Sequence, residues 1–113
     1  MQTTLPGLRA FLDFLIDVRP DLSIPHSLPG RIRLQLALAG IGKAARHDLS
    51  LSVADLDRVA GIEEVRVNTM ARSLVISYDP RQIPDSFWEQ CLSVPDEDLP
   101  DLVMQTLRPR AAP

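Results

Sequence analysis

Apolar residues recur at three- and four-residue steps near the start of the chain: Leu5, Leu8, Phe11, Leu12, Leu15 and Ile16. This spacing places them on one stripe of a helix over residues 6–18, with charged residues largely on the other side. Pro20 ends the helix, because proline lacks a backbone donor and clashes with the preceding turn. Residues 21–29, which include Pro25 and Pro29, are then expected to form an extended linker.

The period of the pattern changes to two after Gly30. Ile32, Leu34, Leu36 and Leu38 alternate with polar or small residues, which predicts a strand over 31–38 with one buried face and one exposed face. A helical pattern follows over 43–60, and its apolar positions are Leu49, Val53, Leu56 and Val59. Gly61 is the expected C-terminal cap of this helix, because glycine adopts the left-handed conformation at little cost.

The second half of the chain predicts a hairpin and at least one helix. Residues 62–67 and 74–78 are rich in β-branched residues and flank a turn over 68–72. Pro84 suits the first turn of a helix that carries Phe87, Trp88 and Cys91 on its apolar side. The segment 94–113 is either a helix that starts near Asp98 or a closing edge strand at 102–107, and the cap residues slightly favour the helix.

These elements predict an α+β fold in one domain. A chain of 113 residues, 45% apolar and 24% charged, has room for a single hydrophobic core. A sheet with one apolar face must be covered, and amphipathic helices are available to cover it.

Charge and cysteine usage exclude several classes of function. The net charge of −3, without a run of Lys or Arg, disfavours binding to nucleic acid. Cys91 is the single cysteine, so no intrachain disulfide forms and the cytoplasm is the expected compartment. No window approaches the roughly 20 apolar residues of a membrane span, so contact with a membrane would be indirect or at its surface.

Three local sequences carry a family resemblance: PGRIRL at 29–34, AGIEEVRVN at 60–68 and VISYDP at 75–80. Together with the order of elements, they resemble the heavy-metal-associated domain superfamily, in particular a divergent branch found as stand-alone small proteins and at the N-termini of some metal-transporting P-type ATPases. The resemblance covers residues 26–93 and sets apart 1–25 as an N-terminal helix and linker and 94–113 as a C-terminal segment. It implies a ferredoxin-like βαββαβ sandwich, in which two helices cover one face of a four-stranded antiparallel sheet.

The resemblance also directs attention to one loop. The best-known members carry a Cys-x-x-Cys pair between the first strand and the first helix, where two thiolates bind a soft metal. The corresponding segment here, AGIGKAARH at 39–47, has no cysteine, which argues against copper delivery there because soft ions need thiolate or thioether donors. The resemblance therefore implies a non-enzymatic accessory or regulatory domain of metal transport or storage that acts by protein contact.

An alternative function is a binding module for a transition metal or haem. His26 would be the ligand, and Arg31 and Arg33 would pair with a carboxylate or a haem propionate. His47 is a second candidate ligand because it lies near the loop that holds metal in relatives, although its neighbour in sequence is Asp48 and Arg46 opposes a cation. The simpler interpretation of both histidines is a solvated surface position, since one imidazole is far from the four ligands of a structural zinc site.

The N-terminal apolar stripe also has alternative interpretations. Leu8, Phe11, Leu12 and Leu15 either pack on the protein's own sheet or form an interface with a partner protein or a second copy of the chain. Self-packing is the first expectation, and attachment to a membrane surface is the last, because the polar side carries aspartates. An enzyme is not expected, because no serine, histidine and carboxylate grouping has a local signature.

Overall fold

The computed structural model describes residues 8–110. The helices are α1 (Arg9–Val18), α2 (Ile41–Ala44), α3 (Leu49–Asp57), α4 (Ser86–Ser93) and α5 (Leu99–Thr106). The strands are β1 (Leu22–Leu28), β2 (Arg31–Leu36), β3 (Ile62–Asn68) and β4 (Ser73–Tyr78). Short 3-10 turns occur at Arg19–Asp21, Leu38–Gly40 and Asp96–Asp98.

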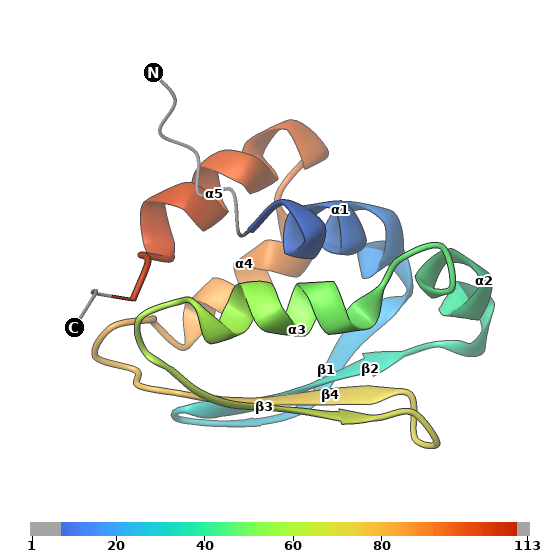
Figure 1. Ribbon diagram of the computed structural model, residues 1–113, viewed down its shortest axis with the longest axis horizontal. Coiled ribbons are helices and arrows are strands. Elements are labelled where there is room, and N and C mark those ends of the chain that lie inside the picture. Colours follow the sequence, from blue (N-terminus) through green and yellow to red (C-terminus); the bar gives the residue numbers. More distant parts are fainter. Residues whose placement is uncertain (1–7, 111–113) are drawn as a thin grey trace.

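The four strands form one antiparallel sheet in the order β1-β2-β4-β3. The helices lie on one face of this sheet, and the other face is left uncovered (Figure 1). Ile32, Leu34 and Ile76 point toward the helices and are at most 4% exposed, as the alternation along β2 predicts. The predicted α+β, ferredoxin-like sandwich with an additional N-terminal helix is confirmed.

The fourth strand comes from the segment that the sequence pattern assigns to a linker. Residues 21–29 were expected to be extended but unpaired, whereas β1 pairs with β2 at the edge of the sheet. The register shifts between Ser23 and His26, so Pro25 lies at an irregularity on an edge strand, where a missing donor does little harm. The C-terminal segment forms the helix α5, which agrees with the favoured alternative for 94–113.

The N-terminal helix α1 is part of the core. Phe11 and Leu15 are each 1% exposed and share one apolar cluster with residues of the sheet and of α5. The backbone N–H of Phe11 donates to Oδ2 of Asp55 on α3 over 2.9 Å. Because the first N–H groups of a helix have no partner within it, this carboxylate caps α1 from a different helix.

The helix expected over 43–60 is divided in two. Asp48 caps the N-terminus of α3, since its side chain accepts a hydrogen bond from the backbone N–H of Ser50 over 3.0 Å. The residues before it form the separate short helix α2. The strand predicted over 31–38 also ends early, at Leu36, and Leu38 is 68% exposed rather than buried.

Two glycines have the left-handed backbone that turns require. Gly30, between β1 and β2, has φ of 80°, and a Cβ there would lie 2.9 Å from the carbonyl oxygen of Tyr78. Gly61 has φ of 95° in the turn before β3, although α3 already ends at Asp57. Within residues 8–110, no helix is long and apolar enough to cross a membrane.

Candidate functional site

His26 lies on the edge strand β1, with its side chain exposed. It pairs with Arg33 on β2, and Leu28 pairs with Arg31, so the register places His26, Arg31 and Arg33 on the uncovered face of the sheet. The three residues therefore share a face, as the alternative with a bound metal or haem requires. The same face carries Arg66 on β3, whose Nε donates to Glu64 over 3.0 Å.

His47 lies on the other side of the sheet, among the helices. Its Nε2 is 2.9 Å from Oδ2 of Asp17 on α1, and its ring meets the ring of Phe14 edge-on at a centroid distance of 5.8 Å. The partner of His47 is thus Asp17 rather than its neighbour Asp48, which caps α3 instead. The two histidines do not converge on one site.

The carboxylates and imidazoles of the protein are dispersed. Within residues 8–110, no group of three or more His, Cys, Asp or Glu side chains is arranged to hold a metal ion. The single thiol, Cys91, is 2% exposed, and burial raises its pKa to about 12. A thiol with such a pKa is almost entirely protonated at neutral pH and is a poor metal ligand and nucleophile.

The apolar stripe of α1 is occupied by the protein itself. Of the four residues expected at a partner interface, Leu8, Phe11 and Leu15 are at most 2% exposed, and Leu12 is partly buried against the same core. Self-packing, the first expectation, accounts for their burial. A partner interface on this stripe stays a prediction, and the exposed area it could use lies at Leu12, which is partly buried, and at Ile16, which is 37% exposed.

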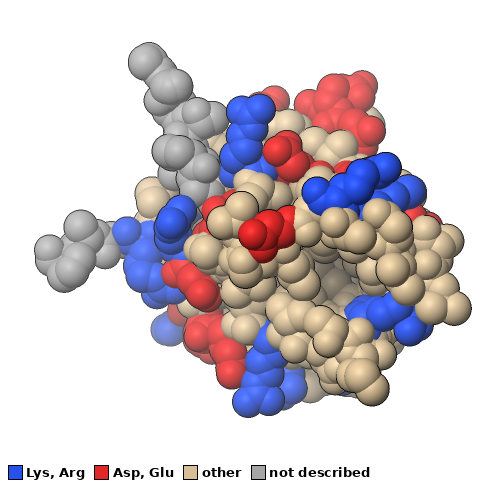
Figure 2. Space-filling view, turned by 45° about the vertical axis from the view of Figure 1, so that its right-hand side comes forward, with Lys and Arg blue, Asp and Glu red and all other residues tan. Residues whose placement is uncertain are grey.

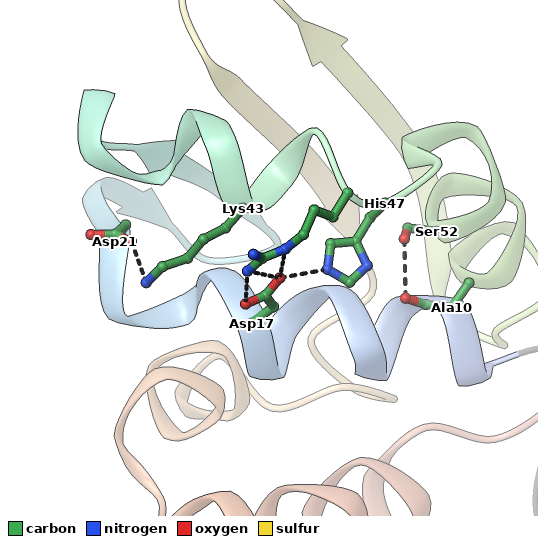
Figure 3. Close-up of polar contacts among 7 residues, drawn as sticks. Ala10, Asp17, Asp21, Lys43, His47 and Ser52 are labelled. Atoms are coloured by element: carbon green, nitrogen blue, oxygen red, sulfur yellow. Dashed lines mark hydrogen bonds and ion pairs between the residues drawn. The ribbon is translucent and has the colours of Figure 1, made fainter.

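The polar side of α1 and the 3-10 turn after it hold the segment around α2 in place. Asp17 accepts hydrogen bonds from Arg46 at 2.9 Å and 3.0 Å and contacts His47, and Lys43 Nζ lies 2.9 Å from Oδ2 of Asp21 (Figure 3). The hydrogen bonds from His47 and Arg46 lower the pKa of Asp17 below its ordinary value. The sequence pattern places Asp17 only on a solvated helix side, so it gave no sign of this role.

An apolar pocket opens beneath α2, with a cavity volume of about 350 Å³. Its lining comes from α1, α2, the start of α3 and all four strands, and the lining residues are Phe14, Leu22, Leu34, Leu36, Ile41, Ala44, Ala45, Leu49, Val67, Asn68, Thr69, Arg72, Ser73 and Leu74. Figure 2 shows this end of the molecule as a hollow among uncharged residues, with basic groups on two of its sides.

Sequence reasoning missed this pocket, and one signal in the sequence could have indicated it. The α2 segment carries the small residues Ala44 and Ala45 where a covering helix usually has larger apolar side chains. A second mark of the site is visible in the structure alone: Arg72 occupies a turn position with φ of 53°, which glycine or asparagine normally fills.

The fold and its helix-covered sheet place the protein among α+β sandwiches of the ferredoxin-like type. The family model for heavy metal associated domain 2 matches residues 11–95, so the chain belongs to this family. Membership connects the protein with heavy metals. Comparisons with curated proteins and with solved structures give no match.

Proposed function

We propose that this protein is a non-catalytic accessory domain of metal transport or storage, acting in the cytoplasm by contact with a partner protein. The observation that carries the proposal is the segment between β2 and α3, residues 37–48, where the best-known heavy-metal-associated domains bind metal. That segment has no cysteine. It forms the short helix α2 instead, and ion pairs with Asp17 of α1 and with Asp21 of the following 3-10 turn fix it in place.

The segment also supplies exposed apolar side chains. Leu38 is 68% exposed and Ile41 is 47% exposed, and Met70, in the turn between β3 and β4 beside the pocket residue Thr69, is 91% exposed. Large apolar side chains that remain in water at one end of a small domain favour a protein interface. The proposed docking surface therefore consists of Leu38, Ile41 and Met70.

The experiment is photo-crosslinking in native cells. A photoreactive phenylalanine analogue replaces Leu38, and in the control it replaces Leu28, which is 54% exposed on β1. Crosslinking from position 38, and not from position 28, to a metal transporter or a metal-storage protein is the expected result. The purified partner should then show a changed rate of metal transport or loading when this protein is added. Equal crosslinking from both positions, or an unchanged rate, would reject the proposal.

A second candidate function is a transition-metal or haem module based on His26. The observation in its favour is that His26 lies beside Arg33 on the uncovered face, with Arg31 two pairs further along. Titration with Zn(II), Fe(II) and haem, using His26→Ala and the control His47→Ala, tests it. Affinity tighter than about 10 μM that is lost only in His26→Ala supports this function, and unchanged affinity in that variant rejects it.

A further inference from the structure

The floor of the pocket is a continuous apolar surface. Leu22 pairs with Leu36 across β1 and β2, and Leu34 pairs with Leu74, which in turn pairs with Val67 on β3. These five side chains line the pocket, so the floor crosses all four strands of the sheet. Neighbouring strands lie about 4.8 Å apart, so the floor is about 14 Å long.

The roof of the pocket is the α2 segment, which contributes Ile41, Ala44 and Ala45 to the lining. Polar contacts that lie outside the pocket hold this roof above the floor. Arg46 ties the α2 segment to Asp17 of α1, and Lys43 ties it to Asp21 in the 3-10 turn that follows α1. Gly40, directly before α2, packs closely against the strand β2, because a Cβ there would lie 2.6 Å from Cδ1 of Leu36. A volume of about 350 Å³ is at the lower end of the range for small-molecule sites, which are mostly apolar with a few placed polar groups.

The placed polar group is Arg72. Among the described residues that line the pocket, it is the one that carries a charge. Its Nε donates to the carbonyl oxygen of Leu36 over 3.1 Å, and within residues 8–110 its two Nη groups have no hydrogen-bond or ion-pair partner. The other basic residues of this end, Lys43 and Arg46, are already paired with carboxylates.

The backbone of Arg72 gives a second reason to assign it a role. Its φ of 53° is the left-handed conformation, which costs roughly 1 to 2 kcal/mol for a residue with a Cβ. Glycine would occupy this turn without that cost. Arg72 thus lines an apolar cavity, has a left-handed backbone and carries Nη groups that have no partner among residues 8–110, a combination that indicates a ligand with an anionic head.

We propose that the pocket binds a free linear carboxylate of medium chain length. Its alkyl chain lies along the floor, and its carboxylate accepts hydrogen bonds from the Nη groups of Arg72. An alkyl chain such as that of decanoate matches the length of the floor. The inference goes beyond the proposed function and does not depend on it, because the site is complete within one chain.

The test is calorimetric titration of the purified protein with decanoate, decanol and decyltrimethylammonium, which share the chain and differ in the head group. Decanoate should bind at least about tenfold more tightly than the other two ligands, the ratio expected for one charge-assisted contact. Equal affinity for all three, or no binding of decanoate up to about 1 mM, overturns the proposal.

Variants assign the binding to this pocket. Arg72→Gln should weaken decanoate binding by about tenfold, whereas the matched Arg81→Gln, at an exposed arginine that does not line the pocket, should leave it unchanged. Arg72→Gly removes the head-group contact in a turn that accepts glycine, so it gives the same result with the fold intact. Ala44→Phe fills the cavity from the roof and should abolish binding, while its melting curve reports that the protein is folded. Binding that survives in folded Ala44→Phe overturns the proposal.

A last arm separates a free ligand from a membrane lipid. Vesicles of phosphatidylglycerol present an anionic head with acyl chains held in a bilayer. Binding to vesicles without binding to decanoate overturns the proposal in favour of a membrane surface. The crosslinking of Leu38 to a partner is scored separately, so the proposed function and this inference fail on different measurements.

Discussion

The cap that Asp55 provides to α1 leads to a quantitative prediction about stability. Asp55 is 6% exposed, and its Oδ2 accepts the hydrogen bond of the Phe11 N–H across two helices. Asp55→Ala removes the acceptor and leaves that N–H buried without a partner. It also removes a negative charge from the positive end of the helix dipole.

The magnitude follows from these two losses. A hydrogen bond to a charged group contributes about 1.5 to 3 kcal/mol, and a carboxylate at a helix N-terminus contributes about 0.3 to 1 kcal/mol. The two overlap at one contact, so Asp55→Ala should lower the free energy of unfolding by about 2.5 kcal/mol. For a domain of this size, that loss lowers the melting temperature by roughly 10 °C.

Thermal and urea unfolding, followed by circular dichroism, measure this loss. Asp57→Ala is the matched control, because Asp57 is an exposed aspartate on the same helix, and its change should stay within about 0.5 kcal/mol. Asp55→Asn keeps an acceptor without the charge and should fall between the two. If Asp55→Ala unfolds at the same temperature as Asp57→Ala, the carboxylate does not hold α1 and the reasoning is wrong.

Three further predictions concern the thiol, the acid limit and a turn. Cys91, whose pKa burial raises to about 12, should resist alkylation at pH 7 in the native protein and react once the protein is unfolded in urea; rapid native labelling would contradict its burial. Hydrogen bonds from His47 and Arg46 lower the pKa of Asp17 in the folded protein. The contribution of Asp17 to stability is therefore present above its ordinary pKa of 3.8 and is lost as pH falls through the lower folded pKa. Between pH 7 and pH 3 the melting temperature should fall less in Asp17→Asn than in the wild type, and parallel curves would refute this. Gly30→Ala should cost more than about 1 kcal/mol, because φ is 80° and the new Cβ would meet the Tyr78 carbonyl oxygen at 2.9 Å; an unchanged urea midpoint would contradict it.

The elements with a clear period were predictable from the sequence. The helix that ends at Val18, the strand that begins at Arg31 and the hairpin of β3 and β4 all lie where the spacing of apolar residues places them. The strand β1 was not predictable, because Pro25 and Pro29 are turn and linker signals. Its pairing depends on an edge position and a register shift, and neither is visible in the sequence.

The candidate site was predictable only in part. The alternation along β2 places Arg31 and Arg33 on one face, but the position of His26 beside them depends on β1. The pairing of His47 with Asp17 joins residues 30 positions apart, so no local pattern indicates it. The pocket likewise arises from the packing of α2 over the sheet, which periodicity does not describe.

The strand β1 also has a consequence for the order in which the chain folds. In a βαββαβ arrangement the closing strand is the last element, so the sheet cannot be completed until that last strand has been synthesised. Here both edge pairings are local, between β1 and β2 and between β3 and β4, and every strand within residues 8–110 lies before Asp79. During synthesis, which proceeds from the N-terminus, the complete set of paired strands leaves the ribosome before α4 and α5. We therefore expect the four strands to be available for pairing before the helices Ser86–Ser93 and Leu99–Thr106 emerge to cover them.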